Sequence, residues 1–354
     1  MNSVVVVGGG VIGLFCAVRL AKAGARVTLL EAETEDVSVY GPAASGAAAG
    51  MLAPFGELSS PHDALALASL DLWRTSQRGA EWADALRADG GVVICQSDEK
   101  SEALVARVAA SGRHADLLTS GAFRKHTGFR AKIEHAVFVT DEGVCDPLRA
   151  ISGLAMQARA HGVVIEYGQD VNNVTANAVR TQEDAVYETD IVVLAPGAWA
   201  TETLKQAAPV LRRVRAGKGH LVSIALDSPP APTVRAPGFY IATRREDVVL
   251  GATMEMDRTD RRVEQARADE LLAAAETLFP GEMKAAGQAW AGIRPMSPDG
   301  WPMIGPSGEV LVAAGHSRNG WLLAPITAEI IRAYVFGAEI PPEWAALSPQ
   351  RFNV

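Results

Sequence analysis

The sequence predicts an α/β fold in which a Rossmann-like domain with a parallel sheet is joined to a second, mixed-sheet α+β domain. Three observations support this prediction. An apolar strand at residues 3–7 enters a glycine-rich turn, a helix with one apolar face follows, and the next strand ends in an acid. Strand-like and helix-like stretches alternate along much of the chain, as is typical of parallel sheets. Short strands at residues 91–139 and 218–254 interrupt this alternation, which indicates a second sheet.

The N-terminal unit is the most specific part of the pattern. Gly8, Gly10 and Gly13 form G-x-G-x-x-G directly after a strand, and Glu31 follows 31 − 13 = 18 residues after the last glycine. In such a unit the first glycine makes the tight turn, the second lets a pyrophosphate approach the backbone, and the third lets helix and strand pack closely. The helix start then faces the phosphates. Glu31 would accept a hydrogen bond from a ribose hydroxyl and repel a 2′-phosphate, so the unit predicts FAD or NAD rather than NADP.

The other elements are predicted from apolar periodicity. In chain order we expect a long amphipathic helix at 64–88 carrying Trp73 and Trp82, short strands with a helix at 91–139, a helix at 150–160, strands at 163–167, 190–195, 221–224, 239–242 and 248–251, and helices at 263–278 and 322–335. The strand at 190–195 ends at Pro196 and Gly197, which suits a backbone that passes close to a bound ligand.

At 354 residues the chain is long enough for two domains. We assign residues 1–75, 140–215 and 290–354 to the nucleotide-binding domain, and residues 76–139 and 216–289 to a substrate domain that caps it. The active site is expected between the two domains.

Composition excludes several classes of function. A net charge of −8 and a pI near 5.5 argue against a nucleic-acid partner. The apolar runs are too short to span a bilayer. No basic segment precedes the strand at 3–7, so we expect a mature N-terminus and a cytoplasmic protein. Cys16, Cys95 and Cys145 form no C-x-x-C pair and are expected to be reduced, and the seven histidines lack metal-ligand spacing, so no metal is expected.

Three segments, at residues 46–54, 290–306 and 315–325, together resemble the D-amino-acid oxidase superfamily of flavoproteins, and within it the glycine oxidases of the thiamine pathway. The resemblance covers essentially the whole chain. It implies a Rossmann-like FAD-binding domain of the GR2 type that holds FAD non-covalently in an extended pose.

The resemblance also implies which residues lie along this cofactor. They are Gly8, Gly10, Val11, Ile12, Gly13, Glu31 and Ala32 toward the adenosine end, Val171 beside the adenine, Ala44, Ser45, Ala49, Gly50 and Met51 near the pyrophosphate and flavin, and His316, Ser317, Arg318, Asn319, Gly320, Trp321 and Leu322 along the isoalloxazine, with Gly197 and Trp199 as further candidates. Glycines at 315 and 320 leave the backbone exposed just before an apolar helix, so a helix N-terminus can stabilise the reduced flavin anion.

For the reacting centre, the resemblance implies that Arg294 binds the substrate carboxylate and that the hydroxyl of Tyr240 touches the same group. The planar guanidinium suits this task because it pairs bidentately with a carboxylate and keeps its charge. Arg318 is implied as a second active-site arginine that contacts flavin or substrate, and Met254 as a lining of a small pocket. Gly238 and Phe239 stand where glycine oxidases often carry a small polar or imidazole residue. This difference leaves the exact substrate open.

The implied reaction is the FAD-dependent oxidative deamination of glycine or a small D- or N-alkyl amino acid. The α-hydrogen would pass as hydride to flavin N5 while the imine forms, and if oxygen then reoxidises the flavin, the second product is hydrogen peroxide. Two alternatives stay open: a dehydrogenase for a D-amino acid or cyclic amino acid that passes electrons to a carrier, and a non-catalytic dinucleotide-binding protein. A covalent-flavin sarcosine oxidase is disfavoured because no cysteine lies in the C-terminal half. Relatives are commonly homo-oligomers, which makes self-association a further expectation.

Overall fold

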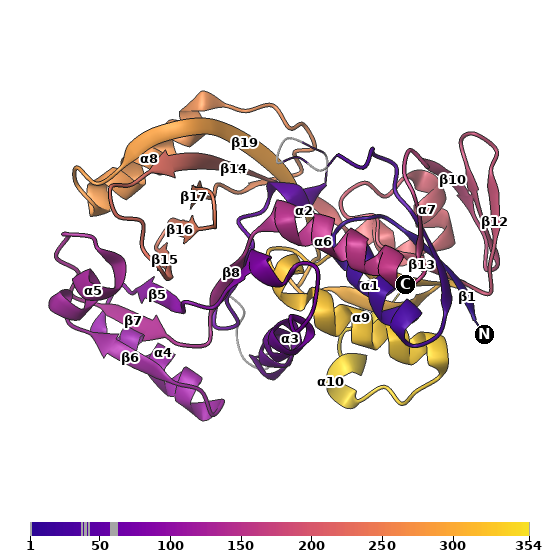
Figure 1. Cartoon of the computed structure of the whole chain (residues 1–354), viewed down its shortest axis with the longest axis horizontal. Coiled ribbons are helices and arrows are strands. Elements are labelled where there is room, and N and C mark those ends of the chain that lie inside the picture. Colours follow the sequence, from indigo (N-terminus) through magenta and orange to yellow (C-terminus); the bar gives the residue numbers. More distant parts are fainter. Residues whose placement is uncertain (1, 37, 39–40, 42, 57–62, 354) are drawn as a thin grey trace.

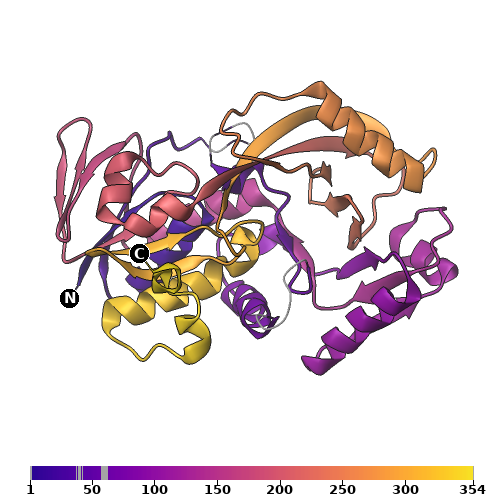
Figure 2. The same cartoon turned by 180° about the vertical axis from the view of Figure 1, so that it is seen from behind.

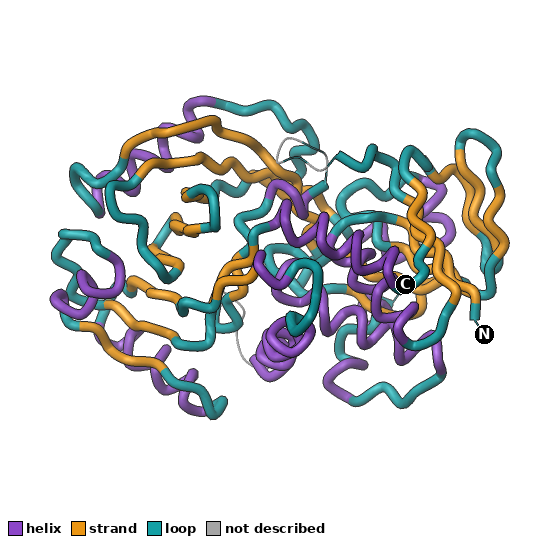
Figure 3. The backbone as a smooth tube through the Cα atoms, in the orientation of Figure 1, coloured by secondary structure: helices purple, strands orange, loops and turns teal. Residues whose placement is uncertain are grey.

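The computed structural model describes residues 2–36, 38, 41, 43–56 and 63–353. Its strands gather in two halves of an elongated molecule (Figures 1 and 2), and both termini lie in the half with the parallel strands. Figure 3 shows helices covering the parallel strands, whereas the other half is dominated by one large sheet.

A six-stranded sheet forms the first half, in the order β20-β21-β13-β1-β2-β9. Its strands are β1 (Ser3–Val7), β2 (Arg26–Leu30), β9 (Val164–Glu166), β13 (Ile191–Leu194), β20 (Met303–Ser307) and β21 (Val310–Ala314). All neighbours are parallel except β20, which runs antiparallel to β21. The predicted Rossmann-like sheet is confirmed.

The four valines of β1 are all buried because both faces of this sheet are covered. Val4 and Val6 pack into the core formed with the helices α1 (Val11–Lys22), α3 (Asp63–Ser76), α6 (Pro147–Ala160) and α9 (Gly320–Phe336). Val5 and Val7 pack on the opposite side, against α7 (Glu202–Ala207), η2 (Pro209–Arg213) and a three-stranded meander of β10 (Val171–Val174), β11 (Ala178–Thr181) and β12 (Val186–Glu188). A continuous apolar run is the expected pattern for such a doubly covered strand.

The second half contains a nine-stranded mixed sheet. Its strands are β5 (Gly91–Ile94), β6 (Ala115–Leu118), β7 (Ala136–Val139), β14 (Arg215–Ala225), β15 (Thr233–Ala236), β16 (Phe239–Thr243), β17 (Val248–Gly251), β18 (Glu255–Met256) and β19 (Lys284–Met296). Only β5 and β15 pair in parallel. The helices α4 (Asp98–Ala110), α5 (Ser120–Thr127) and α8 (Gln265–Leu278) belong to this half (Figure 1).

Two long strands, β14 and β19, join the halves (Figure 1). They pair antiparallel from Arg215 opposite Met296 to Ala225 opposite Lys284. Beside them lies a small sheet of β3 (Met51–Leu52), β8 (Gly143–Cys145) and β4 (Leu86–Arg87). The predicted boundary at residues 289–290 falls inside β19, and the division into domains stays a prediction.

Several elements differ from the expectation. The helix predicted at 64–88 ends at Ser76, because Gly79 adopts a φ of +71° that breaks the helix. Trp82 nevertheless still packs edge-on against Trp73, with ring centroids 5.0 Å apart. Residues 91–139 contain two helices rather than one, and the strand β15 was not anticipated. The remaining short elements are α2 (Ala44–Ala47), α10 (Pro342–Ala345), η1 (Ala83–Ala85) and η3 (Pro349–Phe352).

Within the described residues, none of the helices has the length and apolarity that a membrane crossing requires.

Candidate active site

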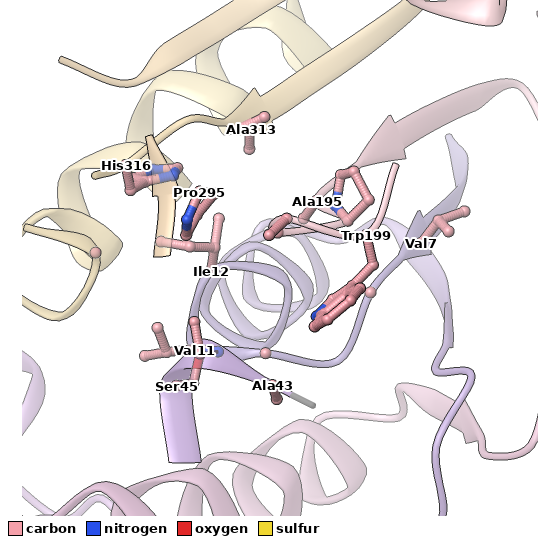
Figure 4. A pocket seen from close by; sticks show the side chains of 18 of the residues that line it. Val7, Val11, Ile12, Ala43, Ser45, Ala195, Trp199, Pro295, Ala313 and His316 are labelled. Carbon is pink, nitrogen blue, oxygen red and sulfur yellow. Dashed lines mark hydrogen bonds between the residues drawn. The ribbon is translucent and has the colours of Figure 1, made fainter. Parts of the chain in front are cut away.

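A cavity of about 510 Å³ opens at the carboxyl ends of β1, β2, β13 and β21. In Figure 4 its labelled side chains surround the beginning of α1, with His316 and Pro295 on one side and Trp199 on the other. Seventeen residues proposed from the sequence line it: Gly8, Gly10, Val11, Ile12, Glu31, Ala32, Ala44, Ser45, Val171, Gly197, Trp199, Arg294, His316, Ser317, Arg318, Gly320 and Trp321. The carboxyl ends of parallel strands are where α/β proteins hold ligands.

The glycine turn has no room for side chains. Gly8 has a φ of +108°, and a Cβ there would lie 2.3 Å from the carbonyl oxygen of Ala195. A Cβ on Gly13 would lie 1.8 Å from the carbonyl oxygen of Gly8. These contacts agree with the turn and packing roles expected from the spacing. Ser45 accepts a hydrogen bond of 3.0 Å from the Val11 amide at the start of α1.

The carboxylate of Glu31 is held at the end of β2. Its two oxygens accept hydrogen bonds from the amide of Gly9 and, at 3.0 Å, from the amide of Glu33. Because these contacts fix the carboxylate at the rim of the cavity, its remaining lone pairs are available to hydroxyl donors. A ribose is a ligand of this kind.

At the other end of the cavity His316 is a neutral, fixed side chain. Its Nε2 lies 3.0 Å from the hydroxyl of Thr327, and that hydroxyl itself donates to the carbonyl of Leu323. Nε2 therefore carries the proton and donates it. Burial lowers the pKa of His316 to about 3, so the ring is uncharged at neutral pH.

The first residues of α9 also line the cavity. Gly320 and Trp321 lie there, and Asn319 is the N-cap without a side-chain hydrogen bond to the helix. The unsatisfied amides of this 17-residue helix therefore create positive potential at the His316 end of the cavity.

Arg294 reaches the cavity from β19, and the neighbouring strands have glycines next to its guanidinium and next to Tyr240. A Cβ on Gly219 would lie 2.0 Å from Nη1 of Arg294. The guanidinium donates a hydrogen bond of 3.3 Å to the carbonyl of Thr253, and it also bonds the hydroxyl of Tyr240. Likewise, a Cβ on Gly251 would lie 2.5 Å from the Tyr240 hydroxyl oxygen. Bare backbone thus makes the space in which the two polar groups meet.

The hydroxyl of Tyr240 keeps its proton. Burial raises the pKa of Tyr240, and the nearby charge and hydrogen bond of Arg294 oppose this only in part. Tyr240 and Arg294 are therefore two hydrogen-bond donors placed next to each other.

Eight of the residues proposed from the sequence do not line the cavity: Gly13, Ala49, Gly50, Met51, Tyr240, Met254, Asn319 and Leu322. Gly50 instead packs against β8, where a Cβ would lie 1.8 Å from the carbonyl oxygen of Cys145. Leu322 is in the core beneath α9. Met254 lies beside Gly217, near Arg294 but outside the cavity wall. Their roles toward cofactor or substrate stay predictions.

Sequence reasoning missed other residues of the wall. They are Val7, Leu30, Glu33, Ala43, Ala48, Gln169, Asp170, Ala195, Ala198, Thr201, Leu204, Pro295, Ala313 and Ala314, whereas Pro196 and Gly315, which the sequence placed near a ligand, do line the cavity. Several follow directly after predicted strands, so the rule that ligands lie at strand carboxyl ends could have found them. No cysteine is among the wall residues that the structure describes, and the described part of the chain holds no group of three or more potential metal ligands.

Comparisons with known proteins agree with this architecture. A family model described as FAD dependent oxidoreductase (DAO) matches residues 3–334. Glycine oxidase of Bacillus licheniformis is 30% identical over 96% of this chain and 94% of its own length. The bifunctional ThiO/ThiG protein of Synechocystis is 31% identical over 99% of this chain, which spans 54% of that protein.

Among solved structures, glycine oxidase from Geobacillus kaustophilus superposes with a TM-score of 0.85 at 28% identity over 99% of both chains. L-proline dehydrogenase from P. horikoshii has the same fold, with a TM-score of 0.85 at 20% identity over 99% of this chain and 98% of that one. The family match covers nearly the whole chain. This protein therefore belongs to the DAO family of FAD-dependent oxidoreductases and is an FAD-binding amino-acid oxidoreductase of the glycine oxidase type.

Proposed function

We propose that the protein oxidatively deaminates glycine or another small D- or N-alkyl amino acid, with oxygen as electron acceptor and hydrogen peroxide as a product. The observation that carries this proposal is the pair of donors formed by Arg294 and Tyr240 beside the FAD cavity. A curated relative that is 30% identical in sequence is named glycine oxidase, which supports the same substrate class.

The cavity suits FAD along its whole wall. Glu31 offers acceptors for the ribose hydroxyls, and the glycine turn brings the backbone and the start of α1 to the place for a pyrophosphate. At the other end, the start of α9 supplies positive potential for a ring system that becomes negative on reduction. With the cysteines away from the wall, we propose that FAD is held without a covalent bond.

Arg294 supplies the recognition of the substrate carboxylate. A guanidinium binds both carboxylate oxygens in one plane, and the neighbouring Tyr240 hydroxyl can donate a third hydrogen bond. Together these contacts hold an amino acid in one orientation, with its α-carbon toward the cavity. Holding reacting groups in a fixed geometry removes much of the entropic barrier.

When bound, FAD supplies the acceptor for the hydride that leaves the α-carbon. The nitrogen lone pair of the substrate forms the imine, so this chain need not provide a base at the α-carbon. Consistent with this, His316 is neutral and its Nε2 proton is engaged by Thr327. The residues therefore act by orientation and by exclusion of water.

The test is a substrate panel on the purified yellow protein. Glycine, sarcosine, D-alanine and D-proline are added anaerobically while the flavin absorbance is followed, and turnover is then measured both as peroxide and with an artificial electron acceptor. Bleaching and peroxide formation support the proposal. Bleaching with turnover only through the artificial acceptor identifies a dehydrogenase instead. If no amino acid or amine bleaches the flavin, the catalytic proposal is wrong.

Cytoplasmic location and self-association stay predictions.

A further inference from the structure

The guanidinium of Arg294 makes a backbone hydrogen bond that has no part in the proposed reaction. The carbonyl of Thr253 accepts a 3.3 Å hydrogen bond from Nη1 of the guanidinium. Thr253 lies between β17 and β18, outside any ladder of the sheet. The direction of this carbonyl therefore depends on what fixes Thr253.

His220 of β14 holds Thr253 through three contacts. Its amide donates to the Thr253 hydroxyl at 2.9 Å, and its ring Nδ1 lies 3.1 Å from the same oxygen. The Thr253 amide in turn faces the His220 carbonyl at 3.4 Å. The far ring nitrogen, Nε2, accepts from the amide of Glu264 at 3.2 Å, so a neutral ring carries its proton on Nδ1, which faces the Thr253 hydroxyl and, at 3.4 Å, a carboxylate oxygen of Glu255.

The imidazole itself cannot reach the cavity. Gly217 and Gly219 are on the face of β14 that meets Arg294, and His220 is on the opposite face because side chains alternate along a strand. It is completely buried. Because a buried polar ring is costly unless its hydrogen bonds are made, the Thr253 and Glu264 contacts constrain it strongly.

We propose that His220 and Thr253 are positioning residues for substrate recognition: they fix the Thr253 carbonyl, which orients the guanidinium of Arg294 toward the substrate carboxylate. The inference rests on the proposed role of Arg294 as carboxylate anchor. It assigns the orientation of that anchor to the Thr253 hydroxyl, a group on the side of the sheet away from substrate.

The test compares Thr253→Val, which removes the hydroxyl, with Thr253→Ser, which keeps it. Thr243→Val in β16 is the matched control, because the Thr243 hydroxyl is buried without a hydrogen-bond partner in the described structure. Binding of acetate to the FAD-loaded protein is measured by calorimetry, and kcat and KM are measured with the best substrate of the panel. FAD affinity is measured for every variant.

We expect Thr253→Val to weaken acetate binding and raise KM about tenfold, with kcat changed less than about threefold, since the guanidinium remains but is no longer oriented. Thr253→Ser and Thr243→Val should stay within about twofold of the original protein in these constants. If Thr253→Val fails to load FAD, Thr253→Ala replaces it with the same expectation.

Arg294→Ala separates the two proposals. If it weakens acetate binding and Thr253→Val does not, or if Thr253→Ser is as weak as Thr253→Val, the positioning inference is overturned while the proposed function stands. If Arg294→Ala leaves acetate binding unchanged, the carboxylate anchor is elsewhere, and both the assigned role of Arg294 and the positioning inference fail, whereas the proposed reaction is decided by the substrate panel.

Discussion

The guanidinium of Arg294 and the hydroxyl of Tyr240 are joined by a hydrogen bond in a space kept open by glycines. Arg294 comes from β19 and Tyr240 from β16, two strands that are not neighbours in the sheet. Strands β14 and β17 lie between them, and the tyrosine ring lies over Gly251 of β17. In the role proposed for this pair, recognition of a carboxylate depends on strands from both sides of β14 and β17.

Replacing Arg294 by Lys tests the need for a planar fork. The ammonium keeps the charge but loses bidentate geometry, so we expect kcat/KM to fall about 100-fold, roughly 2–3 kcal/mol of lost stabilisation. Steady-state kinetics on the best substrate measure this. Arg212→Lys is the control, because Arg212 is exposed and pairs with Glu202 at 2.8 Å. Equal activity of Arg294→Lys and the original protein would contradict the assignment.

Gly219→Ala tests the bare backbone beneath the anchor. The new Cβ would lie 2.0 Å from Nη1 of Arg294, so the guanidinium must move. We expect at least about a tenfold loss of kcat/KM with normal FAD content, since the displaced end belongs to a flexible side chain. Gly121→Ala in α5 should be silent, because the nearest atom to its Cβ would be 3.9 Å away. A silent Gly219→Ala would show that the guanidinium has room to spare.

Glu31→Gln tests the adenosine end. The amide keeps the size of the carboxylate, but it loses the charge and one of the two acceptors that now bind the amides of Gly9 and Glu33. We expect FAD affinity, followed by flavin fluorescence during titration of the apoprotein, to fall about tenfold. Glu35→Gln should leave it unchanged, since Glu35 is exposed and pairs with Arg159. An unaltered affinity in Glu31→Gln would remove this residue from the site.

Because of His316, we expect the free energy of unfolding to decrease in acid. Burial lowers the pKa of His316 in the folded protein to about 3, whereas an unfolded histidine titrates near 6.5. Below pH 6.5 the unfolded chain binds a proton that the folded chain does not, so stability falls as the pH decreases toward 3. Between pH 7.5 and 5 this group should cost about 2 kcal/mol.

Urea unfolding with saturating FAD at the two pH values measures this cost. The His316→Asn variant retains a donor for Thr327 but does not titrate, so its loss of stability should be smaller by a similar amount. Since the pKa of His220 is also lowered, first by burial and then by the charge of Lys218, the difference between the two proteins isolates His316. An identical pH dependence in both would show that His316 is not the group responsible.

The sequence predicted the parts of this molecule that depend on local signals. The strand at 3–7, its glycine turn, the helix after it and the acid at 31 lie within one stretch of chain, and each carries its own signature. The helix break at Gly79 was missed because a single glycine between two tryptophans leaves the apolar pattern unchanged. Strand β15 was missed because it is short and pairs with β5, far away in the chain.

The surroundings of Arg294 could not be predicted for a different reason. The contacts of Gly219 and Thr253 with this arginine depend on the register of β14 against β19 and on the path of the chain after β17. Neither residue carries a sequence signal for its proposed role. A register shift by one residue would move Gly219 to the opposite face, which local periodicity cannot reveal.

The strands β14 and β19 have one more consequence, because Arg294, the proposed carboxylate anchor, belongs to the large mixed sheet while the glycine turn proposed to face FAD belongs to the parallel one. Local unfolding of the mixed sheet displaces Arg294 directly, but it affects Gly8 and Glu31 only through β14 and β19. At low denaturant concentrations we therefore expect a form that still binds FAD, and so stays yellow, but no longer binds amino acids.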